Sequence, residues 1–65
     1  MELYWMQKYL PDGTEIGVSE IVTQIPSDAV KGQDGVWVTW DEIGYTEYRP
    51  FEKEEERWFY ETVKS

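Results

Sequence analysis

The alternation of apolar and polar positions predicts an antiparallel hairpin in the first part of the chain. Residues 2–10 and 14–25 are rich in aromatic and β-branched side chains, a composition typical of strands. Pro11, Asp12 and Gly13 separate these two stretches. Proline presets φ for a turn and glycine takes a positive φ at no steric cost, so we expect a three-residue hairpin loop.

The second of these strands changes its hydrophobic phase part-way along. Apolar side chains stand at positions 16 and 18 in its first half and at positions 21 and 25 in its second half. One face can stay apolar only if an extra residue is inserted near Ser19 and Glu20, so we expect a β-bulge there. We expect the turn to place Leu10 opposite Thr14.

Turn signals divide the middle of the chain into short elements. Residues 27–32 read as a single helical turn, with Ser27 as its N-cap and Gly32 as its terminator. A turn at positions 34–35 precedes a strand at 36–40, and residues 41–44 lead into a further strand at 45–49.

The C-terminal stretch has two interpretations. In the first, Pro50 opens a helix over residues 51–64, whose early glutamates complement the positive end of the helix dipole. In the second, residues 57–63 form a strand that pairs back on 45–51, as the sequence Trp58-Phe59-Tyr60 would favour. The connection between those strands would contain no glycine, proline, asparagine or aspartate, so we prefer the helix.

These elements predict one small acidic domain over residues 1–65 with an α+β fold. We expect a small four-stranded, mainly antiparallel sheet with the C-terminal helix packed on one face. The alternative is an all-β, five-stranded barrel of the SH3-like kind. A chain of 65 residues buries only about 60% of the surface that its unfolded form exposes, so self-association is one way in which such a domain gains stability.

Composition argues against catalysis. The chain has no cysteine and no histidine, which removes thiolate ligands, disulfides, the commonest zinc ligand and the commonest general base. Neighbouring carboxylates such as Asp41 and Glu42 are ordinary for a turn. We therefore expect a non-enzymatic protein with no cofactor and no metal site.

Charge is the most informative property for function. Six basic residues oppose 14 acidic ones, for a net charge of −8, which disfavours direct binding to nucleic acid or to an anionic membrane surface. Residues 1–8 contain neither a basic region nor an apolar run, so we expect no signal peptide. The expected location is the cytoplasm, of a host cell if the protein is viral.

The leading hypothesis is a protein-binding module with a basic partner. Most concretely, it would be an inhibitor that mimics DNA and occupies the basic site of a nucleic-acid-handling protein, a role that suits a phage or mobile-element product. The alternatives are a peptide-recognition module with an aromatic groove and a structural subunit of an assembly, including a homo-oligomer. The residues expected to contact the partner are Asp41, Glu42, Glu47, Glu52, Glu54, Glu55, Glu56, Glu61, Trp58 and Tyr48.

Overall fold

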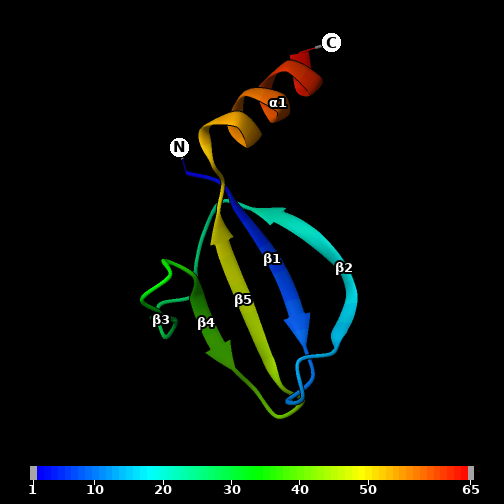
Figure 1. Ribbon diagram of the computed structural model, residues 1–65, viewed down its shortest axis with the longest axis vertical. Coiled ribbons are helices and arrows are strands. Elements are labelled where there is room, and N and C mark those ends of the chain that lie inside the picture. The colour runs from blue at the N-terminus through cyan, green and yellow to red at the C-terminus, as the bar shows by residue number, and fades with distance from the viewer. Residues whose placement is uncertain (1, 65) are drawn as a thin grey trace.

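The computed structural model describes residues 2–64 and contains an antiparallel sheet followed by one helix (Figure 1). The elements are β1 (Tyr4–Tyr9), β2 (Glu15–Val22), β3 (Val30–Lys31), β4 (Trp37–Trp40), β5 (Tyr45–Pro50) and α1 (Lys53–Lys64). The strand order is β2-β1-β5-β4-β3, and every neighbouring pair is antiparallel. The α+β prediction is confirmed, with five strands where four were expected.

The hairpin between β1 and β2 is built as its turn residues predict. The Leu10 amide donates to the Thr14 carbonyl at 2.8 Å, and the Gly13 amide donates to the Leu10 carbonyl at 2.9 Å. Gly13 has φ +92°, and the Asp12 carboxylate accepts a hydrogen bond of 2.9 Å from the Thr14 amide. The conformational preferences of the turn residues therefore set the register in which β1 begins to pair with β2.

The expected irregularity in β2 is present and is larger than predicted. Lys8 pairs with Ile16, whereas Met6 pairs with Glu20. Between these two pairs, Gln7 of β1 faces three residues of β2, 17–19, which means that β2 carries two extra residues where one was expected. Gly17, at φ +72°, lies within this bulge and supplies the backbone conformation that it needs.

The helical turn expected over residues 27–32 is wrong. Val30 and Lys31 are extended and pair with Val38 and Trp37 as strand β3. The Gly32 amide donates to the Val36 carbonyl at 2.9 Å, which closes a small β3–β4 hairpin. Pairing with β4 satisfies the backbone of this segment better than one isolated helical turn, whose nucleus is costly.

The C-terminal segment is helical, so the alternative strand over residues 57–63 is wrong. Pro50 is the last residue of β5, and the helix begins three residues later. The Glu56 amide makes the first helical hydrogen bond to the Glu52 carbonyl at 2.9 Å. The Glu55 side chain accepts from the Glu52 amide at 3.0 Å, as the second half of a capping box does.

The helix does not pack on a face of the sheet, contrary to expectation. It continues beyond the end of β5 (Figure 1), and the molecule measures 39 × 23 × 18 Å. Phe51 joins the two parts: its ring stacks on Trp5 at 4.9 Å and meets the edge of Phe59 at 6.2 Å. The alternative barrel is also wrong, because β2 and β3 remain at opposite edges of an open sheet.

The buried core is correspondingly small. Among the described residues, Leu3 and Tyr48 are the buried hydrophobic side chains, at 3% and 8% exposure. Gln7 and Thr46 are the buried polar ones. These residues belong to β1, β5 and the segment that leads into β1, so the two central strands hold the centre of the domain.

Candidate functional site

The acidic residues lie at the surface, in separate groups along the molecule. No aspartate or glutamate among the described residues is buried. Asp41 and Glu42 lie in the loop between β4 and β5, at the end of the sheet opposite the helix (Figure 1). Four of the other expected contact residues lie on or next to the helix, and these are Glu52, Glu54, Glu56 and Glu61. Glu47 lies between the two groups, within β5.

Asp41 shapes the loop in which it lies. Its carboxylate accepts hydrogen bonds from the amides of Ile43 and Gly44, both at 2.8 Å. These backbone donors, Gly44 first, lower the pKa of Asp41 from its ordinary value. The neighbouring Glu42 is exposed, so this end of the sheet presents negative charge on a hydrogen-bonded turn.

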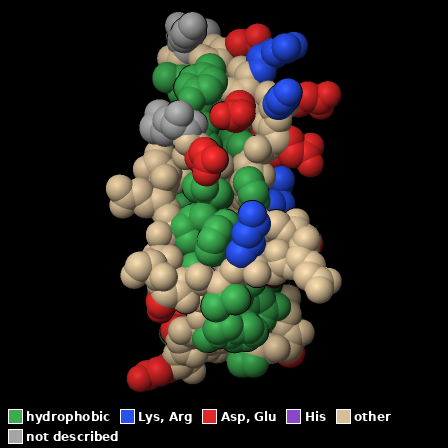
Figure 2. Space-filling model, turned by 90° about the vertical axis from the view of Figure 1, so that its left-hand side faces the viewer, with side chains coloured by type: hydrophobic (Ala, Val, Ile, Leu, Met, Phe, Trp, Pro, Cys, Tyr) green, Lys and Arg blue, Asp and Glu red, His purple; other side chains and the backbone are tan. Residues whose placement is uncertain are grey.

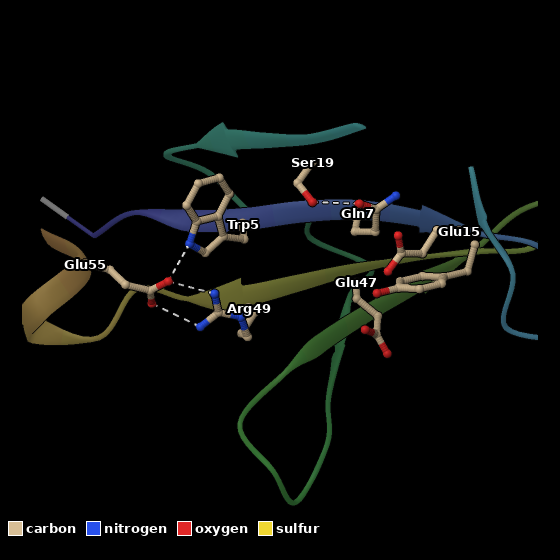
Figure 3. A pocket seen from close by; sticks show the side chains of 8 residues that line it. Trp5, Gln7, Glu15, Ser19, Glu47, Arg49 and Glu55 are labelled. Carbon is tan, nitrogen blue, oxygen red and sulfur yellow. Dashed lines mark hydrogen bonds and ion pairs between the residues drawn. The ribbon is translucent and has the colours of Figure 1, made fainter. Parts of the chain in front are cut away.

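Glu55 is partly exposed, and its carboxylate is held by hydrogen bonds within the protein. One carboxylate oxygen accepts from the Trp5 indole at 2.9 Å, and Arg49 donates to both oxygens at 2.9 and 3.1 Å (Figure 3). The bonds from Arg49 and then that from the Glu52 amide lower the pKa of Glu55 to about 2. Glu55 therefore ties the helix to the sheet, which sequence patterning did not foresee.

The two aromatic residues expected to contact a partner have different environments. Trp58 is 53% exposed on α1 and is accessible. Tyr48 is only 8% exposed, so the expectation that it forms part of a contact surface is corrected. Tyr48 belongs to the central strand β5, where Met6 and Trp37 flank it on the neighbouring strands, and burial in the core is its structural role.

A hollow of about 370 Å³ lies over β1. Trp5, Gln7 and Tyr9 form its floor, because alternate residues of a strand point to the same face. Glu15 of β2 and Glu47 of β5 stand on either side (Figure 3). Carboxylates and aromatic rings thus line one concave surface.

Hydrogen bonds to the buried Gln7 side chain fix the floor of this hollow. The Ser19 hydroxyl donates to the Gln7 side-chain oxygen at 2.6 Å (Figure 3). The Gln7 amide nitrogen donates to the carbonyls of Ile16 and Lys8 at 3.2 and 3.1 Å. Gln7 is therefore satisfied, and it binds the bulged part of β2 to β1.

An aromatic row continues from the hollow across the sheet. The Tyr9 and Tyr45 rings stack at 5.1 Å, and Trp40 lies against Tyr45 at the same centroid distance. Burial, followed by the charges of Glu47 and Glu15, raises the pKa of the Tyr9 hydroxyl. Trp40 is 71% exposed at the outer end of the row. The row links a negatively charged hollow to an accessible indole.

Sequence reasoning did not identify the hollow, although its floor follows from a simple pattern. Strand alternation places Trp5 and Tyr9 on one face. The partners on either side, Glu15 and Glu47, depend on the pairing of β1 with both β2 and β5. The second pairing joins strands that are distant in sequence, and no local signal in the chain specifies it.

Within residues 2–64, no group of carboxylates is placed to hold a metal ion. No helix in that range is both long and apolar enough to cross a membrane. No protein-family model, curated protein or solved structure matches this chain, so its function must be inferred from its own residues.

Proposed function

We propose that this chain is a non-catalytic protein-binding module whose acidic surface occupies the basic site of a nucleic-acid-handling protein. One observation carries the proposal: the negative charge is at the surface and largely uncompensated. The chain has 14 acidic residues against six basic ones, and within residues 2–64 none of the acidic ones is buried. Within the described part of the chain, Glu55 forms an ion pair with Arg49 and Glu61 also interacts with a neighbouring group, whereas the other carboxylates form no ion pair.

The helix supports the choice of a phosphate-binding site as the target. Glu52, which directly precedes α1, and Glu56 in its first turn are four positions apart, and residues at this spacing on a helix have Cβ atoms about 5–6 Å apart. That spacing approaches the distance between neighbouring phosphates on one nucleic-acid strand. Because α1 extends beyond the sheet (Figure 1), its carboxylates can enter a groove that the sheet itself would not fit.

Charge alone gives attraction but little selectivity. Long-range attraction between oppositely charged surfaces speeds association, and this attraction weakens as salt is added. Exposed aromatic side chains supply the short-range part of many interfaces. Trp58, on the same helix as Glu54 and Glu56, is 53% exposed and is the aromatic anchor in this proposal.

The test compares two variants with the same change in net charge. Glu54→Gln/Glu56→Gln removes two negative charges from the helix and leaves Glu55 in place. Glu20→Gln/Asp28→Asn removes two negative charges from exposed positions outside the helix. The intact chain is used to capture partners from cell extract at low and high salt, with duplex DNA as competitor.

We expect a captured nucleic-acid-binding protein that high salt releases and duplex DNA displaces. The helix variant should capture much less of it than the control variant. A partner that neither salt nor DNA affects would contradict the proposal, and so would equal losses in both variants.

A second candidate function, recognition of a peptide by an aromatic surface, is favoured by the exposure of Trp40. This indole is 71% exposed and rests against Tyr45. Under this candidate function, Trp40→Ala abolishes capture of the partner while Glu54→Gln/Glu56→Gln leaves it unchanged. The captured complex would also persist in high salt and in the presence of DNA.

A further inference from the structure

We propose that the hollow over β1 receives one cationic side chain, arginine or lysine, from the basic partner. This inference rests on the proposed function and assigns it a specific pocket. The hollow does not include Glu54 and Glu56, the helix glutamates that the proposed function uses, although Glu55 lines it. Four of its residues carry the argument, namely Trp5, Tyr9, Glu15 and Glu47.

The strand register brings two carboxylates to opposite sides of β1. Glu15 pairs with Tyr9 across the β1–β2 ladder, and Glu47 pairs with Gln7 across the β1–β5 ladder. Paired residues of neighbouring strands lie on the same face of a sheet. A group seated over β1 between Gln7 and Tyr9 therefore has an acceptor on each side (Figure 3).

The charge of the hollow remains negative after its internal ion pair is counted. Arg49 is the cation among the lining residues, and it donates two hydrogen bonds to Glu55. Neither Glu15 nor Glu47 forms an ion pair within the described residues. Lys8 follows Gln7 in β1, so its side chain leaves from the opposite face. Two negative charges are thus available to a ligand.

The polar groups left in the hollow suit a ligand that donates hydrogen bonds. The Trp5 indole nitrogen is bound to Glu55, and the Gln7 amide is bound to Ser19 and to two carbonyls. The carboxylates of Glu15 and Glu47 can accept further hydrogen bonds, although Glu47 also interacts with the Tyr9 hydroxyl. Ammonium and guanidinium groups carry donors and no acceptor.

The aromatic side chains favour the same class of ligand. Trp5 and Tyr9 line the hollow, and aromatic faces attract cations. One face of each ring is stacked on Phe51 or Tyr45, so the opposite face is the one that can contact a cation. Burial and the nearby carboxylates raise the pKa of the Tyr9 hydroxyl, which agrees with a negative potential at this place. A volume of about 370 Å³ lies at the small end of the range for ligand pockets and suits a single side chain.

The experiment titrates three small probes into the intact, isotope-labelled chain at low ionic strength and follows backbone amide and indole signals by nuclear magnetic resonance. The probes are N-acetyl-arginine amide, N-acetyl-lysine amide and N-acetyl-citrulline amide, the last being a neutral analogue of arginine. We expect saturable shifts at Trp5, Gln7 and Tyr9 with a cationic probe and none with citrulline. Equal shifts with all three, no shifts at all, or shifts spread over the whole surface would overturn the inference.

Three variants separate the hollow from the general negative charge. Glu15→Gln and Glu47→Gln should each weaken binding of the cationic probe about fivefold, the effect of about 1 kcal/mol for an exposed ion pair. Glu20→Gln is the matched control, because Glu20 pairs with Met6 and so lies on the other face of the sheet. Equal weakening by Glu20→Gln would overturn the inference.

The outcome also distinguishes this inference from the proposed function. If no cationic probe binds in the hollow while DNA still displaces a captured partner, the inference fails and the proposed function stands. If a cationic probe binds there while no basic partner is captured, the hollow is a cation site and the proposed function fails.

Discussion

Glu55 shows how much of this small fold depends on single side chains. It joins β1, β5 and α1 through Trp5, Arg49 and the Glu52 amide. We expect Glu55→Gln to lower the free energy of unfolding by about 1 kcal/mol, because the ion pair with Arg49 is lost at a partly exposed position. Glu54→Gln, one residue away and exposed, is the control and should change stability by less than about 0.5 kcal/mol. Equal effects in urea denaturation would contradict this role for Glu55.

The same carboxylate predicts a pH dependence with a definite sign. The pKa of Glu55 falls from 4.5 to about 2 in the folded protein, so folding favours its charged form. Its contribution to stability is fully present above pH 4.5 and is lost as the pH falls towards 2. The difference in unfolding free energy between the wild type and Glu55→Gln should therefore shrink over this window. A constant difference from neutral pH to pH 2 would contradict the assigned pKa.

Gly44 is required by the close approach of two backbone segments. A Cβ atom at this position would lie 2.1 Å from the Tyr9 carbonyl oxygen. We expect Gly44→Ala to destabilise the protein by at least about 2 kcal/mol, because the strands must separate to admit the methyl group. Gly32→Ala is the matched control, since its Cβ would mainly meet the flexible Asp34 side chain. Thermal unfolding of the two variants should differ clearly, and similar melting temperatures would contradict the steric argument.

At the scale of elements, the helix is held to the sheet by one aromatic contact in addition to Glu55. Phe59 meets the edge of Phe51, which in turn stacks on Trp5. We expect Phe59→Ala to lower the helical circular-dichroism signal and the unfolding free energy by about 1–2 kcal/mol. Trp58→Ala, at a position that is 53% exposed, should change stability by less than about 0.5 kcal/mol. A larger effect of Trp58→Ala would show that the outward face of the helix is packed in solution.

The elements that sequence predicts well are those defined by neighbouring residues. The turn at Pro11–Gly13 is specified by the φ preferences of its own residues, and the structure confirms it. The shift in the pattern of apolar residues along β2 likewise predicted a bulge. The structure confirms the bulge, which contains two extra residues and not one. The short strand at Val30–Lys31 was missed because its stability comes from pairing with β4 and not from its own sequence.

The arrangement of the elements and the candidate site were less predictable. Nothing in the sequence of α1 specifies that the helix extends beyond the sheet. An apolar stripe indicates that one face of a helix is buried, but it does not indicate which element packs against that face. Glu55 reads as one of three consecutive glutamates, and its partners Trp5 and Arg49 lie on strands distant in sequence. The hollow has the same origin: Glu15 and Glu47 flank Tyr9 only because β1 pairs on both of its edges.

The whole molecule is extended, with a thin core and much apolar surface. Its radius of gyration is 12.8 Å, whereas a compact chain of this length would have about 11 Å. Apolar side chains are visible along the β3–β4 side of the molecule (Figure 2). Val30, Trp40 and Ile43 are each more than half exposed. A partner that covers such a surface stabilises the folded chain by mass action.

The net charge of −8 predicts opposite effects of salt on folding and on binding. Uncompensated carboxylates repel one another in the folded state, and at about 0.15 M salt this repulsion is screened beyond about 8 Å. We therefore expect the melting temperature of the isolated chain to rise as sodium chloride is added, while the affinity for its basic partner falls over the same range. Glu20→Gln/Asp28→Asn, with two fewer negative charges, should show a smaller rise. A melting temperature that stays constant or falls as salt is added would mean that charge repulsion does not limit the stability of the folded chain. The carboxylates would then be less available to a partner than the structure indicates.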